Sequence, residues 1–132
     1  MLRDPSLIPL SHQHHNGLAL CVMTERELAR DCSAESIARL ARRAVDRYEV
    51  ELSNHFEIEE QVLFPEFPGA LVDDLIRDHR RLESMIGALR DQPTAGMLAE
   101  FTDLLRQHIR REENELFEAI QRELPRETLD RL

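Results

Sequence analysis

One stretch of sequence and its repetition decide the fold. Residues 55–64 are HFEIEEQVLF, and residues 108–117 are HIRREENELF. The second stretch follows the first by 53 positions, and the histidine, the two consecutive acids, the leucine and the phenylalanine recur at matching places. Apolar residues around both stretches recur every three or four positions, which is the period of an amphipathic helix. The repeat therefore predicts two helices of one design, each with His-x-x-x-Glu on its buried face.

Helical periodicity extends outward from these stretches over four segments, and no alternating strand pattern is sustained. Ser11, Ser33 and Thr94 are suitable N-caps, and Pro65 and Pro125 are suitable stops. The expected helices run from about Ser11 to Arg30, from Ser33 to Phe64, from Ala70 to Arg90 and from Thr94 to Glu123. Short turns between amphipathic helices predict an all-α, up-down-up-down four-helix bundle. We expect one domain over residues 1–132, with its core at about 10–124.

A weaker repeat links the first and third helices. Residues 15–18 are HNGL and residues 79–82 are HRRL. The chain thus resembles two helical hairpins of one design. Packed face to face, the hairpins would bring histidines from all four helices to one level of the core.

Composition narrows the classes of function. The chain has 132 residues, 42% hydrophobic and 33% charged, with a net charge of −9. No stretch approaches the roughly 20 apolar residues of a membrane span, and the acidic balance argues against sequence-independent nucleic-acid binding. We expect no secretion leader in the first residues, and two cysteines are too few for a disulfide framework. We therefore expect a cytoplasmic protein that acts on neither membranes nor nucleic acid.

The His-x-x-x-Glu spacing indicates metal chemistry. Residues at i and i+4 lie on one helix face, so each motif aims an imidazole and a carboxylate at the same point. His55 with Glu59 and His108 with Glu112 supply two nitrogens and two carboxylates, and a carboxylate can bridge two metals. A buried carboxylate is costly without a partner, and a cation supplies one. The donor set suits iron, and also manganese or zinc.

The first-helix position has more than one candidate. His12, His14 and His15 cluster there, and we favour His15 because it aligns with His79 and stands in register with Leu18. His14, one turn before Leu18, remains the alternative. The acids at +5, Glu60 and Glu113, lie about 100° from the +4 position on a regular helix, so they are expected to be solvated.

This constellation resembles the hemerythrin-like, or HHE cation-binding, family. The matching residues are a first-helix histidine within residues 11–15, His55 with Glu59, His79 with Glu83, and His108 with Glu112. The resemblance implies a four-helix bundle around a non-haem di-iron centre with bridging carboxylates. The chain also departs from the pattern of the respiratory hemerythrins that it resembles. That pattern has His-x-x-x-His on the third helix and an Asp five residues after the last histidine.

The residues and the resemblance together predict a metal site and a small ligand. The expected ligands of two iron ions are His15, His55, Glu59, His79, Glu83, His108 and Glu112, with His14 as the alternative on the first helix. We expect the protein to bind, sense or scavenge dioxygen, nitric oxide or peroxide, or to handle iron, rather than to turn over a substrate. The alternatives are a di-iron oxidase or peroxidase similar to ferritin-like enzymes, and a metal-free structural bundle.

Overall fold

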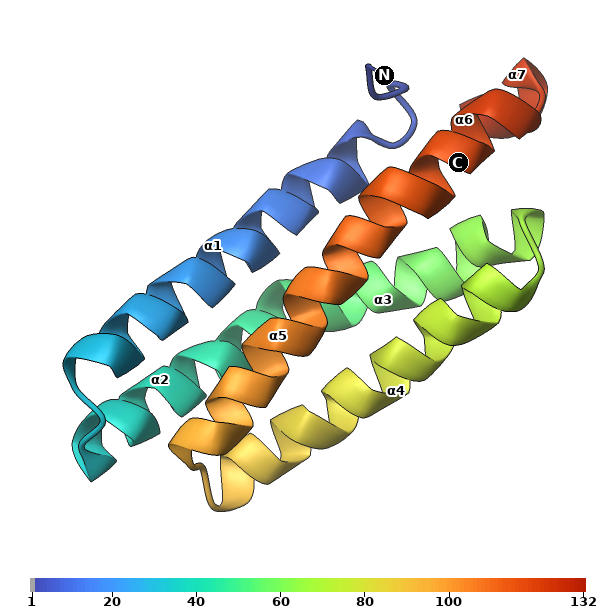
Figure 1. Ribbon diagram of the computed structural model, residues 1–132. Coiled ribbons are helices and arrows are strands. Elements are labelled where there is room, and N and C mark those ends of the chain that lie inside the picture. Colours follow the sequence, from blue (N-terminus) through green and yellow to red (C-terminus); the bar gives the residue numbers. More distant parts are fainter. Residues whose placement is uncertain (1) are drawn as a thin grey trace.

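The computed structural model describes residues 2–132, and every regular element of that part is helical (Figure 1). The four long rods are α1 (Ile8–Arg30), the rod that begins as α2 (Ala34–Arg47), α4 (Ala70–Asp91), and the rod that begins as α5 (Ala95–Arg111). The second rod continues through η1 (Tyr48–Leu52), α3 (Ser53–Ile58), η2 (Glu59–Leu63) and η3 (Phe64–Glu66). The fourth continues through η4 (Glu112–Leu116) and α6 (Phe117–Glu123), and α7 (Arg126–Asp130) follows it.

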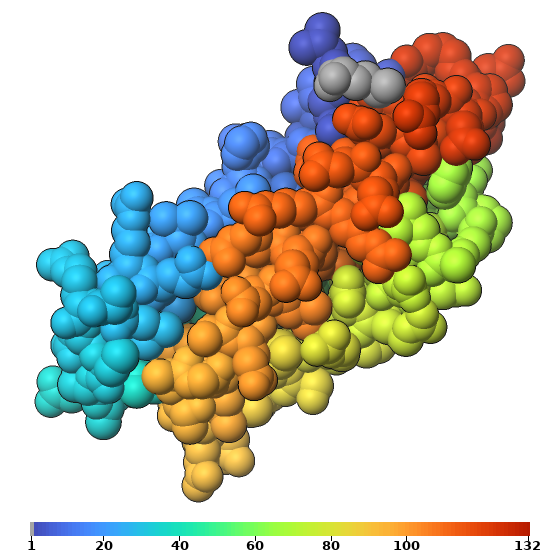
Figure 2. Space-filling model, viewed as in Figure 1, coloured from blue at the N-terminus to red at the C-terminus, as the bar shows by residue number. Residues whose placement is uncertain are grey.

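The rods form the expected up-down-up-down bundle. α1 contacts α2 and α5, and α4 contacts the same two helices from the other side (Figure 1). On the face drawn in Figure 2, side chains of α1 and α5 meet and cover the interior. The all-α prediction is confirmed, and among residues 2–132 no helix is long and apolar enough to cross a bilayer.

Two apolar clusters fill the bundle. One contains Leu40, Phe56, Leu82 and Leu105, and the other contains Leu63, Leu75, Leu116 and Phe117. The second cluster also takes in Leu7 and Leu129, which lie outside the span of 10–124 expected for the core. A buried polar residue separates the two clusters along each rod: His14 in α1, His79 in α4, and Glu59 and Glu112 in the other two rods. The clusters therefore bracket a polar layer in the middle of the bundle.

Two of the three expected caps are confirmed. The Ser33 side chain accepts a hydrogen bond from the Ser36 N–H, and the Thr94 side chain accepts one from the Met97 N–H. The third is wrong, because α1 begins at Ile8 and Ser11 lies inside the helix. A proline in the first turn of α1 fits this earlier start, since the first helical N–H groups have no intrahelical partner.

The buried face of α1 also differs from the expected one. Leu10, His14, Gly17, Cys21 and Thr24 face inward, at alternating spacings of four and three. Leu18 is only half-buried, and Val22 is 41% exposed. A Cβ at Gly17 would lie 2.9 Å from Cδ1 of Ile109, so glycine permits the close approach of α1 to α5. Because the buried seam contains a glycine and a threonine, the pattern of apolar residues alone does not show which face of α1 is buried.

The two cysteines are free thiols in different settings. Cys21 is buried, and burial raises the pKa of its thiol to about 11. Cys32 lies beyond the end of α1 and is exposed.

Candidate metal centre

The polar layer contains one histidine from each rod and one glutamate from each of two rods. His14, His55, His79, His108, Glu59 and Glu112 are at most 3% exposed. Their donor atoms form two groups, each with all four atoms within 4.8 Å of one another. We call His14, His55, Glu59 and Glu112 the first group, and His79, His108, Glu59 and Glu112 the second group.

Local helix geometry places the two glutamates. η2 begins at Glu59 and η4 begins at Glu112, which are the same position of the sequence repeat. The Phe64 N–H donates to the Glu59 carbonyl five residues back, so the regular ladder gives way to a wider turn. The Phe117 N–H does the same with the Glu112 carbonyl. Short π-helical turns of this kind are frequent at functional sites.

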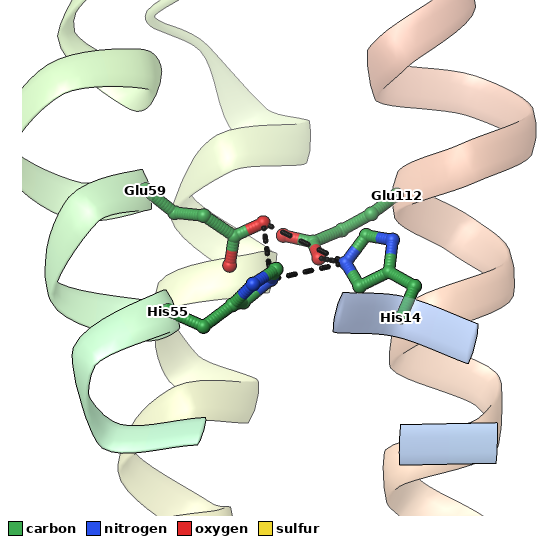
Figure 3. Close-up of side chains that lie close together, drawn as sticks. All are labelled: His14, His55, Glu59 and Glu112. Carbon is green, nitrogen blue, oxygen red and sulfur yellow. Dashed lines mark hydrogen bonds and ion pairs between the residues drawn. The ribbon is translucent and has the colours of Figure 1, made fainter. Parts of the chain in front are cut away.

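The first group converges on one point (Figure 3). The Nε2 atoms of His14 and His55 lie 3.1 Å apart. Nε2 of His14 is 2.8 Å from Oε1 of Glu112, and Nε2 of His55 is 3.3 Å from Oε2 of Glu59. Two imidazoles and two carboxylates thus face one another from three rods.

The second group repeats this arrangement. The Nε2 atoms of His79 and His108 also lie 3.1 Å apart. Nε2 of His79 is 3.1 Å from Oε1 of Glu59, and Nε2 of His108 is 3.4 Å from Oε1 of Glu112. Because Glu59 and Glu112 belong to both groups, their carboxylates stand between two sets of paired imidazoles.

Unpartnered buried oxygens test whether a cation fits here. Within the described part of the chain, neither oxygen of Glu59 has a hydrogen-bond partner, and neither does Oε2 of Glu112. Leaving a charged group buried without a partner is expensive, and coordination of a cation removes that cost. Imidazole and carboxylate are also ligands that iron, manganese and zinc accept. The donor set therefore fits one cation in each group.

A second layer of side chains orients the imidazoles. Nδ1 of His14 lies 2.5 Å from a Glu113 oxygen, and Nδ1 of His79 lies 2.7 Å from a Glu60 oxygen. With the Nδ1 proton held outward, the Nε2 lone pair of each ring is directed into the layer.

The remaining two rings are held in the same way by residues of α1 and α4. Nδ1 of His55 is 2.7 Å from Oε1 of Gln13, and Nδ1 of His108 is 3.1 Å from Oδ2 of Asp78. All four rings thus present Nε2 inward, as metal ligands do.

The pKa shifts show that the two facing carboxylates retain protons in and around the layer. Burial and the Glu112 carboxylate raise the pKa of Glu59 well above its usual range. Burial opposes ionisation of Glu112 as well, but the charge of His108 outweighs it and holds the pKa of Glu112 well below its usual range. Burial lowers the pKa of His55 and of His79 to about 3. It disfavours protonation of His108 too, but Glu112 and Asp78 raise the pKa of that ring to about 9. Without a metal, protons therefore take the place of a cation.

The structure brings together five of the seven expected ligands: His55, Glu59, His79, His108 and Glu112. It does not bring His15 there. His15 is exposed, and its neighbour His14, the alternative, occupies the first-helix position. The choice of His15 relied on register with Leu18, and the buried seam of α1 lies one residue earlier.

Glu83 is also outside both groups. It forms an ion pair with Arg80 instead, with an oxygen 2.6 Å from the guanidinium. α4 is a regular helix whose buried seam passes through His79, Leu82 and Ile86. The seam of α4 thus continues at +3 after its histidine, which leaves +4 on the flank, whereas the seams of the second and fourth rods continue at +4 through the buried Glu59 and Glu112.

The second layer contains four residues that the sequence did not predict there. Glu60 and Glu113 were expected to be solvated, but each lies within a wider turn and binds a buried imidazole. Gln13 and Asp78 were not recognised. The only signal was that Gln13 and Asp78 each directly precede a histidine of the layer.

Comparison with known proteins agrees with the geometry. A family model described as the hemerythrin HHE cation-binding domain matches residues 7–120. Neither the curated proteins nor the solved structures gave a match. The match spans most of the chain and contains all six residues of the two groups. The chain belongs to the hemerythrin HHE cation-binding family.

Proposed function

We propose that the protein holds a non-haem di-iron centre in its two groups and binds a small oxidant there, such as dioxygen or nitric oxide. The observation that carries this proposal is the pair of four-donor groups that share two buried carboxylates with unpartnered oxygens. His14 and His55 would hold one ion, His79 and His108 the other, and Glu59 and Glu112 would contact both. Iron supplies open coordination positions and one-electron chemistry when bound.

Burial of the site supports a small ligand. The six residues are at most 3% exposed, so an organic substrate has no direct access to them. A surface groove of about 230 Å³, lined by Phe56, Glu60, Arg80 and Glu83 among others, reaches the outer partner of His79. Binding of a diatomic molecule or peroxide, rather than turnover of a larger substrate, is therefore the role we propose. The two free thiols are compatible with the cytoplasmic location that we also propose.

The chain contributes position and proton control to this function. Glu60 and Glu113 accept the Nδ1 protons of His79 and His14, which keeps both inward nitrogens available. Phe56 stacks on His79 with ring centroids 4.0 Å apart, and Phe117 stacks on His14 at 5.3 Å. These aromatic rings exclude water from the two histidines.

Reconstitution with ferrous iron under anaerobic conditions tests the proposal. We expect about two irons per chain in the wild type, and an optical change on exposure to dioxygen or nitric oxide. Glu59→Gln and Glu112→Gln should each lose the paired site, because each removes a carboxylate charge that both groups share. Glu57→Gln, on the same rod but exposed, is the matched control and should keep both irons. Less than a tenth of an equivalent of iron, manganese or zinc in the wild type would overturn the proposal.

A further inference from the structure

The two pairs of imidazoles have nearly the same geometry. The inward nitrogens of each histidine pair are 3.1 Å apart in both groups. The ring centroids are 4.8 Å apart in both, with interplanar angles of 57° and 59°. The placement of the imidazoles therefore gives no reason for one ion to differ from the other.

The charge behind the imidazoles is not the same. Glu113 behind His14 and Glu60 behind His79 are both carboxylates, at matching positions of the repeat. The other matching pair differs, because His108 bonds the carboxylate of Asp78 whereas His55 bonds the neutral amide of Gln13. The second group is thus backed by two carboxylates, and the first group by one carboxylate and one amide.

This difference changes the donor strength of the metal-facing nitrogen. A carboxylate that accepts the Nδ1 proton increases the basicity of the ring, and a neutral amide does so less. Asp78 and Gln13 are both partly buried, so the single charge that separates them is incompletely screened by water.

We infer that the two metal positions are inequivalent, with Asp78 making the second group the stronger site and Gln13 leaving the first group the weaker one. The inference rests on the proposed di-iron function. Gln13 and Asp78 act as positioning residues, since each works through an imidazole and neither belongs to the two groups. Outer partners of this kind change metal affinity by about 10–100-fold, and the first ion added occupies the second group.

Mössbauer spectra of protein loaded with two equivalents of ferrous ⁵⁷Fe test the inference. The wild type should show two quadrupole doublets of equal area. Gln13→Glu and Asp78→Asn are near-isosteric, and each should bring the two doublets together. Gln13→Glu would do so by strengthening the first group, and Asp78→Asn by weakening the second group. The double variant should separate them again, a recovery that mere structural damage would not produce. Gln92→Glu, in an exposed loop, makes the same charge change away from the site and should leave both doublets unchanged.

A zinc competition titration decides the matter even if a second-layer variant fails to fold. His55→Ala retains both histidines of the second group, and His108→Ala retains both histidines of the first. We expect His55→Ala to bind Zn²⁺ about 10–100-fold more tightly than His108→Ala.

The outcomes separate the two proposals. A wild type that binds two equivalent irons, equal zinc affinities for the two half-site variants, or doublets indifferent to Gln13→Glu and Asp78→Asn would overturn the inequivalence and leave the di-iron centre standing. A wild type that binds no metal would overturn both.

Discussion

At the scale of single residues, a shift of one position along α1 decides which histidine enters the site. His14 and His15 are adjacent and chemically identical, yet His14 is 3% exposed and forms part of the first group whereas His15 faces solvent. About 100° of helical rotation separates neighbouring residues, which is enough to move a side chain from the core to the surface.

His14→Ala and His15→Ala form a matched pair. His14→Ala should lower the iron content from about two ions to about one, because it removes one of the two nitrogens of the first group. His15→Ala should leave the iron content unchanged. Iron analysis of both variants after the same anaerobic reconstitution is the measurement, and the reverse result would restore His15 as the first-helix ligand.

At the scale of helices, π-helical turns and one glycine shape the layer. η2 and η4 allow consecutive acids to serve different functions, with +4 facing the opposing carboxylate and +5 holding a histidine of the other hairpin. Gly17 allows α1 to approach α5 closely where His14 must reach Glu112.

Gly17→Ala and Gly87→Ala should differ in their effect on the free energy of unfolding. Gly87 is an exposed helical residue whose added Cβ would have no atom within 4 Å, so alanine should stabilise the protein by about 1 kcal/mol. A Cβ at Gly17 would lie 2.9 Å from Cδ1 of the buried Ile109, and overpacking of a core typically costs about 1–3 kcal/mol, which offsets or exceeds that gain. Urea denaturation of the metal-free variants measures the difference, and equal stabilisation by both would contradict the close approach.

At the scale of the whole molecule, the layer exists only when two hairpins pack together. One hairpin contains His14 and His55, and the other contains His79 and His108. Each hairpin also supplies an outer acid to the opposite one, through Glu113 to His14 and Glu60 to His79. Because the unfolded chain has no such site, metal binding is linked to folding of the entire bundle.

Stability of the metal-free protein should fall as the pH rises from about 6.5 to about 9. The pKa of His108 is raised to about 9, so its stabilising contribution is complete below the unfolded value of 6.5 and is lost as the pH passes through 9. The raised pKa values of His14 and Glu59 act in the same direction. The lowered pKa values of His55 and His79 oppose this only below 6.5, where the unfolded rings take up protons.

Melting curves of metal-free and iron-loaded protein between pH 6.5 and 9 measure this dependence. The free energy of unfolding should decrease by about 1.4 kcal/mol per pH unit for each proton that the folded state retains. The iron-loaded protein should melt at a higher temperature and lack this decline, because the metal takes the place of those protons. Coincident melting temperatures for the two forms across the range would argue against a buried metal site.

The sequence by itself determined the four helices, two of their caps and five of the six residues in the two groups. These features depend on local periodicity and on a repeat, both of which are visible along the chain. Tertiary packing decided the rest. His14 faces inward because the seam of α1 contains Gly17 and Thr24, whose burial becomes visible only against α5. Glu60 and Glu113 belong to the site because each lies in a wider turn and contacts a histidine of another rod. Contacts between rods cannot be predicted from any single segment.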